Sequence, residues 1–439
     1  PGGCRLSALI GRGADMEQMA RAGIPPDHPM AAHLRTTVEA MLDLPRHLGQ
    51  HSGGMVICQG QLDSIVPLQP ASMPGRVIVQ WDKEDCADMG IIKVDLLGLG
   101  MMAVLKESID LIRVHYRKEV DLAAIPKDDP AVYDALQRAD TIGMFQVESR
   151  AQMSCLPRMR PANFYDIVVQ VAIIRPGPIV GNMLHPYLRR RQGMEPPVSL
   201  HPSLDHVLKR TLGVPLFQEQ LLRMAMIAAN FTGGEAEDLR RAMGFKRSQK
   251  RMAEVEQRLR AGMAANGIDG PAQEAIVQSI TAFALYGFPE SHAASFALLS
   301  YASAYLKEHY LAAFTAAILN NQPMGFYSPS TLVKDAQRHG LRVLPVDVTV
   351  SAWPCTLEPR DGALCLRLGL NYVKGLRQAV AERIVAERPF ASIDELKRLV
   401  PTLSKEELYR LAELGALNKI EGSVQRHRRE AVWQASLAA

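Results

Sequence analysis

The chain lacks the signatures of several common protein classes. It contains no run of about 18 uninterrupted apolar residues, the length with which a helix crosses a bilayer, so no membrane partner is expected. Its six cysteines are scattered, with no C-x-x-C pair and no adjacent histidine set, which favours reduced structural thiols over a zinc site. The start has neither an initiator methionine nor a signal-peptide apolar core, so we expect a piece of a cytoplasmic protein.

A strong excess of charge is also absent. The formal net charge is +4, and 22% of the 439 residues are charged. This excess is too small to indicate a nucleic-acid binder by itself, so the local distribution of charge has to decide. With 47% hydrophobic residues, the chain is long enough for about two to four globular domains.

The spacing of apolar residues predicts separate helical and strand-rich blocks. Residues 16–49 have helical spacing, whereas 51–97 contain short runs rich in Val and Ile, separated by Gly, Pro and Asp, which predict a sheet. Long amphipathic stretches over 101–310 predict one large helical domain. A mixed segment then leads to a final helical block from residue 378. The predicted fold class is α+β, mostly α.

The string IIKVDLLG at 91–98 is the first candidate site. In a strand, Lys93 and Asp95 point to one face while Val94 points to the other. For phosphoryl transfer, a carboxylate on a rigid strand holds magnesium and a nearby lysine neutralises phosphate charge. A salt-bridged pair on a half-exposed strand is the simpler interpretation.

A basic run at 239–251 is the second candidate. It contains six cations and no carboxylate, so it attracts phosphates. It also follows an acidic helix start at Glu235 and reaches a helix end at Gly244. The helix dipole therefore explains part of the pattern without any ligand.

Several shorter strings have the composition of turns and caps. In YGFPESH at 286–292, Glu290 or Ser291 is expected near a helix N-cap, which puts His292 at a helix start suited to a phosphate. Capping without catalysis is the simpler interpretation. Three other strings, FQVESR at 145–150, RPGP at 175–178 and FQEQ at 217–220, are weak signals when each is taken alone.

The C-terminal block has the pattern of a helix-hairpin-helix. The string GLNYVKGL at 369–376 precedes a predicted helix at 377–387, and a second helical pair ends near Leu417. Such a hairpin exposes backbone N–H groups to a phosphate without reading base sequence. The basic tail at 425–429 adds charge nearby. A helical packing module with no ligand is the alternative.

Taken in order, these strings resemble the α subunit of bacterial DNA polymerase III, the C family of DNA polymerases. The strings that carry the resemblance are HSGG at 51–54, KVDLLGL at 93–99, FQVESR, RPGP, FQEQ, LRRAMG at 239–244 and YGFPESHAASFALLSY at 286–301. The variants QWDK, ESRAQM, HPYLRRRQG, GFPESHAASF and NNQPMGFYSP are more similar to its error-prone, damage-tolerant branch.

The resemblance implies four parts. Residues 1–49 would be part of the thumb, and 50–98 the C-terminal part of a polymerase-β-like palm sheet. A large helical fingers domain would cover 99–345. A tandem helix-hairpin-helix module that binds duplex DNA would cover 346–439.

The resemblance also assigns roles residue by residue. Asp95 is similar to the third catalytic aspartate, a magnesium ligand, and Lys93 to the lysine beside it. The positions similar to nucleotide-binding residues are Arg240, Arg241, Tyr286, His292 and His51. The DNA-binding positions are Lys374 and Gly375 in the hairpin and Lys246 and Arg247 in the basic run.

The implied reaction is attack of a primer 3′-hydroxyl on the α-phosphate of a deoxynucleotide, with two magnesium ions. In the family, two further aspartates complete the metal site as Asp-x-Asp, and this sequence contains no Asp-x-Asp. The family's N-terminal phosphoesterase-like (PHP) domain is absent as well. We therefore expect the 439 residues alone to bind primer-template duplex weakly without polymerising.

The implied partners are primer-template DNA and deoxynucleotides and, in the full-length protein, a sliding clamp and mutasome accessory proteins. The implied setting is error-prone synthesis during DNA repair in the bacterial cytoplasm, at the nucleoid. Two alternatives remain. One is a non-catalytic DNA-binding protein that kept the fingers and hairpin modules, and the other is an unrelated helical protein with a basic patch.

Overall fold

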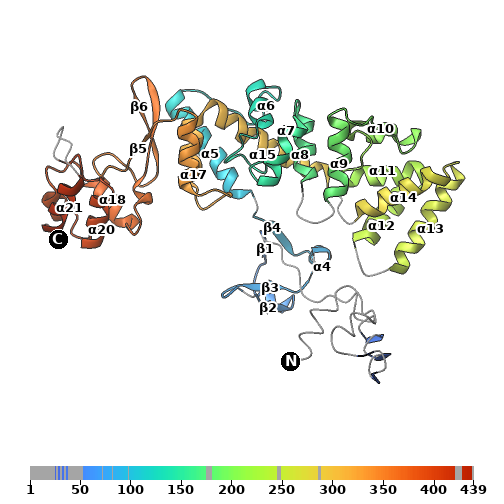
Figure 1. Cartoon of the computed structure of the whole chain (residues 1–439). Helices are drawn as coiled ribbons and strands as arrows, with labels where there is room; N and C mark the ends of the chain where they lie inside the picture. Colours follow the sequence, from blue (N-terminus) through green and yellow to red (C-terminus); the bar gives the residue numbers. More distant parts are fainter. Residues whose placement is uncertain are drawn as a thin grey trace. The chain divides into compact units, whose positions relative to one another are not determined.

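The fold is that of a computed structural model in which part of the chain is described. The described residues are 25, 28–29, 32–33, 36–37, 53–420 and 428–437, apart from 72, 82, 97, 175–179, 245–248 and 285–287. The predicted helical unit at 16–49 and the RPGP string lie mostly or wholly outside them. The chain divides into two compact units (Figure 1). Unit 1 comprises Pro1–Leu97, Ser199–Val207 and Gln218–Gly287, and unit 2 comprises Gly98–Val198, Leu208–Phe217 and Phe288–Ala439.

Unit 1 begins with short strands, as the sequence predicts for 51–97. Strand β1 (Gly54–Ile57) pairs antiparallel with β4 (Ile92–Asp95), and β2 (Leu68–Pro70) pairs antiparallel with β3 (Val77–Val79). The strands form two separate two-stranded ladders rather than one sheet. Glycines with positive φ at 60, 75 and 90 turn the chain between them. The 3-10 helix η1 (Leu62–Ser64) and the helix α4 (Lys83–Asp88) fill the connections.

The other described elements of unit 1 are helices. Its elements are η2 (Pro202–Leu204), α11 (Gln218–Ala229), α12 (Gly233–Gly244), α13 (Gln249–Ala265) and α14 (Gly270–Ala284). A reciprocal cap starts α12, because Thr232 and Glu235 each accept the other's backbone N–H through their side chains. Gly262 lets α13 approach α11 closely, since a Cβ there would lie 2.2 Å from the Ala229 carbonyl oxygen.

Unit 2 contains a larger helical block. Its helices are α5 (Leu99–Tyr116), α6 (Pro130–Gln137), α7 (Arg150–Met159), α8 (Phe164–Ile173), α9 (Val180–Arg191), η3 (Lys209–Thr211), α15 (Glu290–His309), α16 (Leu311–Asn320) and α17 (Pro329–Arg338). The short helix α10 (Asp205–Leu208), most of which belongs to unit 1, precedes η3. Helix α15 packs against α8 and α5, and α16 packs against α5 (Figure 1). These helices share one hydrophobic core.

The C-terminal part of unit 2 begins with a small sheet. Its strands, β5 (Val343–Leu344), β6 (Thr356–Arg360) and β7 (Ala363–Arg367), lie in the order β5-β7-β6. The 3-10 helix η4 (Leu370–Tyr372) and the helices α18 (Gln378–Ala386), α19 (Ile393–Leu399), α20 (Lys405–Glu413) and α21 (Arg428–Leu437) follow. These helices enclose a second hydrophobic core.

The predicted fold class, α+β and mostly α, is confirmed. Long helices occur within the predicted amphipathic stretches over 101–310, among them α5, α13 and α15. The five described cysteines are free thiols, as predicted. None of the described helices combines the length and apolar character of a membrane span.

Candidate functional site: the β4 strand, the fingers motifs and the paired hairpins

Strand β4 places the Lys93 and Asp95 backbones in a defined register. Gly54 lies opposite Asp95, and Val56 lies opposite Lys93. The Leu96 amide extends the ladder by donating to the Gly53 carbonyl oxygen at 2.7 Å. Because Gly54 has no side chain, nothing on β1 occupies the position directly across from Asp95. Lys93 is solvent-exposed.

His292 lies in an aromatic row along the first turns of α15. Its exposed ring lies 5.1 Å from the ring of Phe288 and 4.1 Å from that of Phe296, measured between centroids. Phe296 in turn meets Phe145 edge-on at 5.3 Å, which links the row to the FQVESR string. The row fixes His292 at the surface near the start of a helix.

The helix start predicted near Glu290 and Ser291 is confirmed, although the N-cap residue makes no side-chain cap. Pro289 occupies the N-cap position of α15 and Glu290 is the first helical residue. The Glu290 carboxylate instead accepts a hydrogen bond from the Tyr165 hydroxyl at 2.9 Å. The Arg210 guanidinium lies 3.5 Å from the centroid of the Tyr165 ring. Glu290 thus contacts a polar partner on α8.

The FQVESR string forms a turn and a cap. Gln146 has a φ of 62°, and the Ser149 side chain caps α7 by accepting the Gln152 amide. The buried Glu148 carboxylate accepts the amides of Gly143 at 2.9 Å and Phe326 at 3.2 Å. Burial raises the pKa of Glu148. The Glu148 side chain thus links the loop at Gly143 to the loop at Phe326.

An acidic cluster that the sequence did not indicate lies between α15 and α17. Asp140, Asp335 and His339 bring ligand-type atoms within 4.8 Å of one another. The Lys307 ammonium, on a side chain only 3% exposed, lies 2.9 Å from Asp335 and 3.7 Å from Asp140. A cation of the protein itself thus neutralises these carboxylates, so the cluster does not fit the expected magnesium site.

The two hairpins of the C-terminal module are related position by position. The first hairpin comprises residues 373–377 before α18, and the second comprises 400–404 before α20. Both have the pattern V-x-x-L-x. In both, the leucine amide donates to the valine carbonyl oxygen, at 3.1 Å in the first and 3.0 Å in the second. The helix before the first hairpin is reduced to η4, whereas α19 precedes the second.

The first hairpin presents backbone donors and a cation to solvent. Gly375 has a φ of 86°, and a Cβ there would meet nothing within 4 Å. Lys374 is exposed. The amides of Lys374, Gly375, Gln378 and Ala379 have no hydrogen-bond acceptor among the described residues. Together with the α18 dipole, these donors form a surface suited to an anion.

One carboxylate connects the two hairpins. Glu407 Oε1 accepts the Arg377 amide at 3.0 Å and Arg377 Nε at 2.9 Å. Its Oε2 accepts Arg377 Nη2 and the Ser404 amide, both at 2.9 Å. The hydrogen bonds from Arg377, aided by the Ser404 amide against the effect of burial, lower the pKa of Glu407 to about 2. The sequence signal was the S-x-x-E capping box at 404–407, which the sequence analysis missed.

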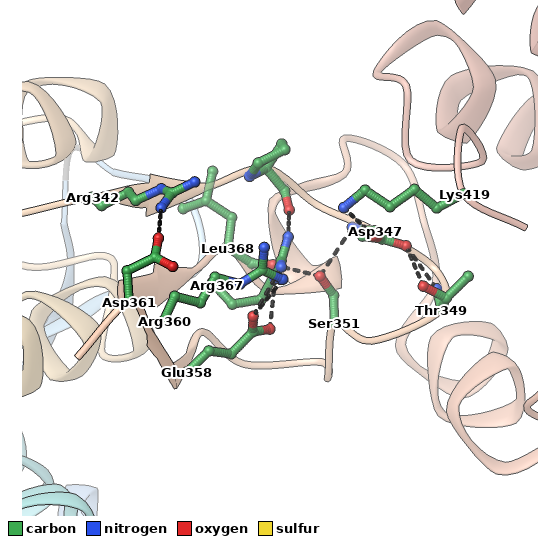
Figure 2. Close-up of polar contacts among 11 residues, drawn as sticks. Arg342, Asp347, Thr349, Ser351, Glu358, Arg360, Asp361, Arg367, Leu368 and Lys419 are labelled. Atoms are coloured by element: carbon green, nitrogen blue, oxygen red, sulfur yellow. Dashed lines mark hydrogen bonds and ion pairs between the residues drawn. The ribbon is translucent and has the colours of Figure 1, made fainter. Parts of the chain in front are cut away.

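Buried polar contacts join the hairpin module to the small sheet (Figure 2). The fully buried Arg367 donates to both carboxylate oxygens of Glu358, at 2.7 and 2.9 Å, and to the Pro345 carbonyl oxygen at 2.6 Å. Asp347 accepts the Lys419 ammonium at 3.1 Å and the Thr349 hydroxyl at 2.7 Å. The Arg367–Glu358 pair thus links β7 to β6, Arg367 also holds the segment after β5 through Pro345, and the Asp347–Lys419 pair links that segment to the module.

Comparison with protein-family models identifies the family of this chain. Family models match three consecutive parts of the chain: the bacterial DNA polymerase III alpha NTPase domain at 7–98, the finger domain of the same subunit at 101–267, and a helix-hairpin-helix motif at 340–431. The chain belongs to the bacterial DNA polymerase III α-subunit family. The resemblance drawn from the sequence is therefore confirmed.

Relatives within this polymerase family are similar over nearly the whole chain. Proteins named "Error-prone DNA polymerase" from Anaeromyxobacter sp. strain K, Alkalilimnicola ehrlichii and Pseudomonas aeruginosa are 51%, 48% and 47% identical over 98%, 97% and 98% of this chain. The chain spans 40%, 41% and 42% of their respective lengths.

Several residues predicted for the polymerase site stay predictions. His51, Lys246, Arg247 and Tyr286 lie outside the described residues. Arg240 and Arg241 lie near the C-terminal end of α12, and Asp95 ends β4, but their side chains are not among those described. The salt bridge considered for Lys93 and Asp95 is therefore untested. Lys374, Gly375 and His292 are exposed as their predicted roles require.

Proposed function

We propose that these residues are part of an error-prone DNA polymerase that joins a deoxynucleotide to a primer 3′-hydroxyl. The observation that carries the proposal is the β1–β4 register, which sets Asp95 opposite Gly54 beside an exposed Lys93. A short strand pair keeps both backbones in place, and the missing side chain at Gly54 leaves room for a metal and phosphates. Similarity to error-prone polymerases over 98% of the chain supports the assignment.

The proposed roles follow the charge of each residue. Asp95 would hold magnesium, and Lys93 would neutralise phosphate charge next to it. Arg240 and Arg241 on α12 would bind the incoming triphosphate, with Tyr286, His292 and His51 as further nucleotide contacts. Lys246 and Arg247 would contact the DNA backbone. Placement and charge, rather than covalent chemistry, are what the protein contributes to phosphoryl transfer.

The residues of this chain supply part of a magnesium site. When bound, it supplies activation of the 3′-hydroxyl and charge neutralisation at the phosphates. Asp95 is a ligand of the right chemistry, but the sequence has no Asp-x-Asp pair to accompany it. The other acidic cluster, at Asp140 and Asp335, already contacts the Lys307 ammonium. These residues therefore supply one carboxylate of the proposed two-metal site.

The hairpin module would bind the primer-template duplex. The free amides around Lys374 and Gly375 suit a DNA phosphate, and phosphate contacts are independent of base sequence. The proposed partners of the full-length protein are a sliding clamp and mutasome accessory proteins. The proposed process is DNA damage repair, and the proposed location is the bacterial cytoplasm, at the nucleoid.

The test is a substitution at Asp95 in a polymerase-active protein that contains these residues. Asp95→Asn should lower nucleotide incorporation about a thousandfold, because a lost metal ligand removes several kcal/mol of charge stabilisation. The matched control is Asp88→Asn, an exposed carboxylate at the end of α4, which should leave incorporation unchanged. Primer-extension rates at saturating magnesium would measure both. Equal activity of the two variants would contradict a catalytic Asp95.

A non-catalytic duplex-binding protein is the second candidate. It is favoured by the hairpin module, whose donors are described in full, whereas the chain contributes a single carboxylate to the metal site. For such a protein, Asp95→Asn should change neither duplex binding nor nucleotide incorporation. The comparison of Asp95→Asn with Asp88→Asn therefore separates the two candidates.

A further inference from the structure

We propose that Glu407 is a positioning residue for duplex binding, and that the second hairpin serves as a brace for the first rather than as a second phosphate site. The proposal rests on the duplex-binding function proposed above and deepens it. It concerns residues 30 positions apart, Arg377 and Glu407, that no local sequence pattern brings together.

The geometry of the Glu407 carboxylate is the first line of support. Its two oxygens accept the N-cap amides of both hairpins, Arg377 N at 3.0 Å and Ser404 N at 2.9 Å. The two remaining hydrogen bonds come from the Arg377 side chain, which also donates Nη2 to the Thr402 carbonyl oxygen at 2.6 Å. A single buried side chain therefore holds the starts of α18 and α20 at a fixed separation.

The chemistry of the second hairpin is the second line of support. Pro401 stands where the first hairpin has Lys374, so the turn lacks that cation and one backbone donor, and the exposed Lys405 stands one residue beyond the N-cap, where the first hairpin has Gln378. Glu406 stands where the first hairpin has Ala379, and its carboxylate is exposed at the start of α20. A carboxylate at that position repels a phosphate and competes for the helix dipole. The second hairpin is thus a poor anion site.

The consequence concerns how the first hairpin holds its shape. Arg377 is the N-cap of α18 and makes no side-chain cap, so the start of that helix depends on the contact with Glu407. The free amides of Gly375 and Gln378 lie on either side of Arg377 in the chain. Backbone donors bind a phosphate well only when they are held in one arrangement, and Glu407 supplies that constraint.

The experiment asks whether removing the Glu407 charge strengthens or weakens duplex binding. Glu407→Gln removes a negative charge, which by electrostatics alone should strengthen binding to DNA. The positioning role predicts the opposite: binding about tenfold weaker, since a charge-assisted contact is lost. The matched control Glu406→Gln, in the same turn, should bind about twofold more tightly through its charge alone. Dissociation constants of the 439-residue chain for a primer-template duplex would be measured at one salt concentration.

A second measurement separates positioning from general stability. In a double-mutant cycle, Lys374→Ala should lose most of its effect in the Glu407→Gln background, because both changes act on the same hairpin. If Glu407→Gln does not fold, Arg377→Lys takes its place. It keeps the charge but not the paired hydrogen bonds, and should bind duplex about fivefold more weakly while remaining folded, with a melting temperature lowered by only a few degrees.

The outcomes are distinct. Unchanged or tighter binding by Glu407→Gln, or by Arg377→Lys where that variant is used, overturns the positioning role while the duplex-binding function stands. Equal weakening by Glu406→Gln overturns it as well, since the effect would then be general to the turn. Absence of duplex binding by the unaltered chain overturns the proposed function itself.

Discussion

The two hairpins share the leucine-to-valine backbone hydrogen bond and a helix start, but they differ in surface chemistry and in the backbone of the turn, where Gly375 has a positive φ. The first ends in Lys374 and Gly375, with unpaired amides on both sides of its N-cap. The second ends in Pro401 and Thr402, is closed by the Ser404 capping box and is flanked by Glu406. A shared backbone motif therefore does not imply a shared role. The side chains decide whether the helix start stays open to an anion or is satisfied within the protein.

The largest expected effect tests the backbone of the first hairpin. Gly375→Ala places a side chain at a φ of 86°, which should cost about 1–2 kcal/mol of folding stability although space is available. Any relaxation of this strain shifts the Lys374 and Gly375 amides, so duplex affinity should also fall, by about tenfold. Thermal unfolding and duplex titration would measure the two changes. Thr402→Ala, at the equivalent position of the second hairpin, should change affinity less than twofold.

An intermediate effect tests the cation. Lys374→Ala should weaken duplex binding about threefold and equally for all sequences, and the slope of log K against log salt should decrease by about one phosphate contact. Lys405→Ala, which removes an exposed lysine after the second hairpin, should leave the slope nearly unchanged. Titrations at several salt concentrations would compare them. Equal slope changes would mean that both hairpins contact phosphates.

The smallest effect tests the connection between the hairpins by pH. The pKa of Glu407 is about 2 in the folded chain, below its ordinary value of 4.5, so its ionised form stabilises the fold. This contribution is complete above about pH 5 and is lost as the pH falls from there toward 2. The melting-temperature difference between the unaltered chain and Glu407→Gln should therefore be constant from pH 7 to 5 and shrink below. A difference that grew on acidification would contradict the assignment.

Local sequence patterns predicted the elements but not their partners. Periodicity located α5, α13 and α15 and the strands around Val56 and Lys93, since each pattern lies within one segment. It did not predict that these strands pair in two separate ladders, because pairing depends on distant segments. For the same reason the Arg377–Glu407 contact and the Lys307 cluster were missed, the latter joining residues more than 150 positions apart.

In the candidate site too, sequence patterns indicated residues that are neighbours in the chain but not contacts between distant segments. Lys93, Asp95 and the first hairpin could be predicted because their residues are adjacent in sequence, and their roles, which the family resemblance implies, stay predictions. Glu290 lies at the start of α15 as predicted, but the distant Tyr165 hydroxyl, which no local pattern indicates, donates to its carboxylate. Helix-capping rules hold only where no tertiary partner competes for the side chain.

The burial of Arg367 has an entropic consequence for DNA binding. A hairpin module tethered by a flexible linker would lose its freedom to swivel when it docks on a duplex, and that loss would oppose association. Here Arg367 on β7 holds the segment after β5 through the Pro345 carbonyl oxygen, and Asp347 in that segment binds Lys419 of the module (Figure 2). The module therefore loses its rotational freedom when the chain folds, before it binds DNA. Association with a duplex then has to order the DNA and a few exposed side chains, but not a whole domain.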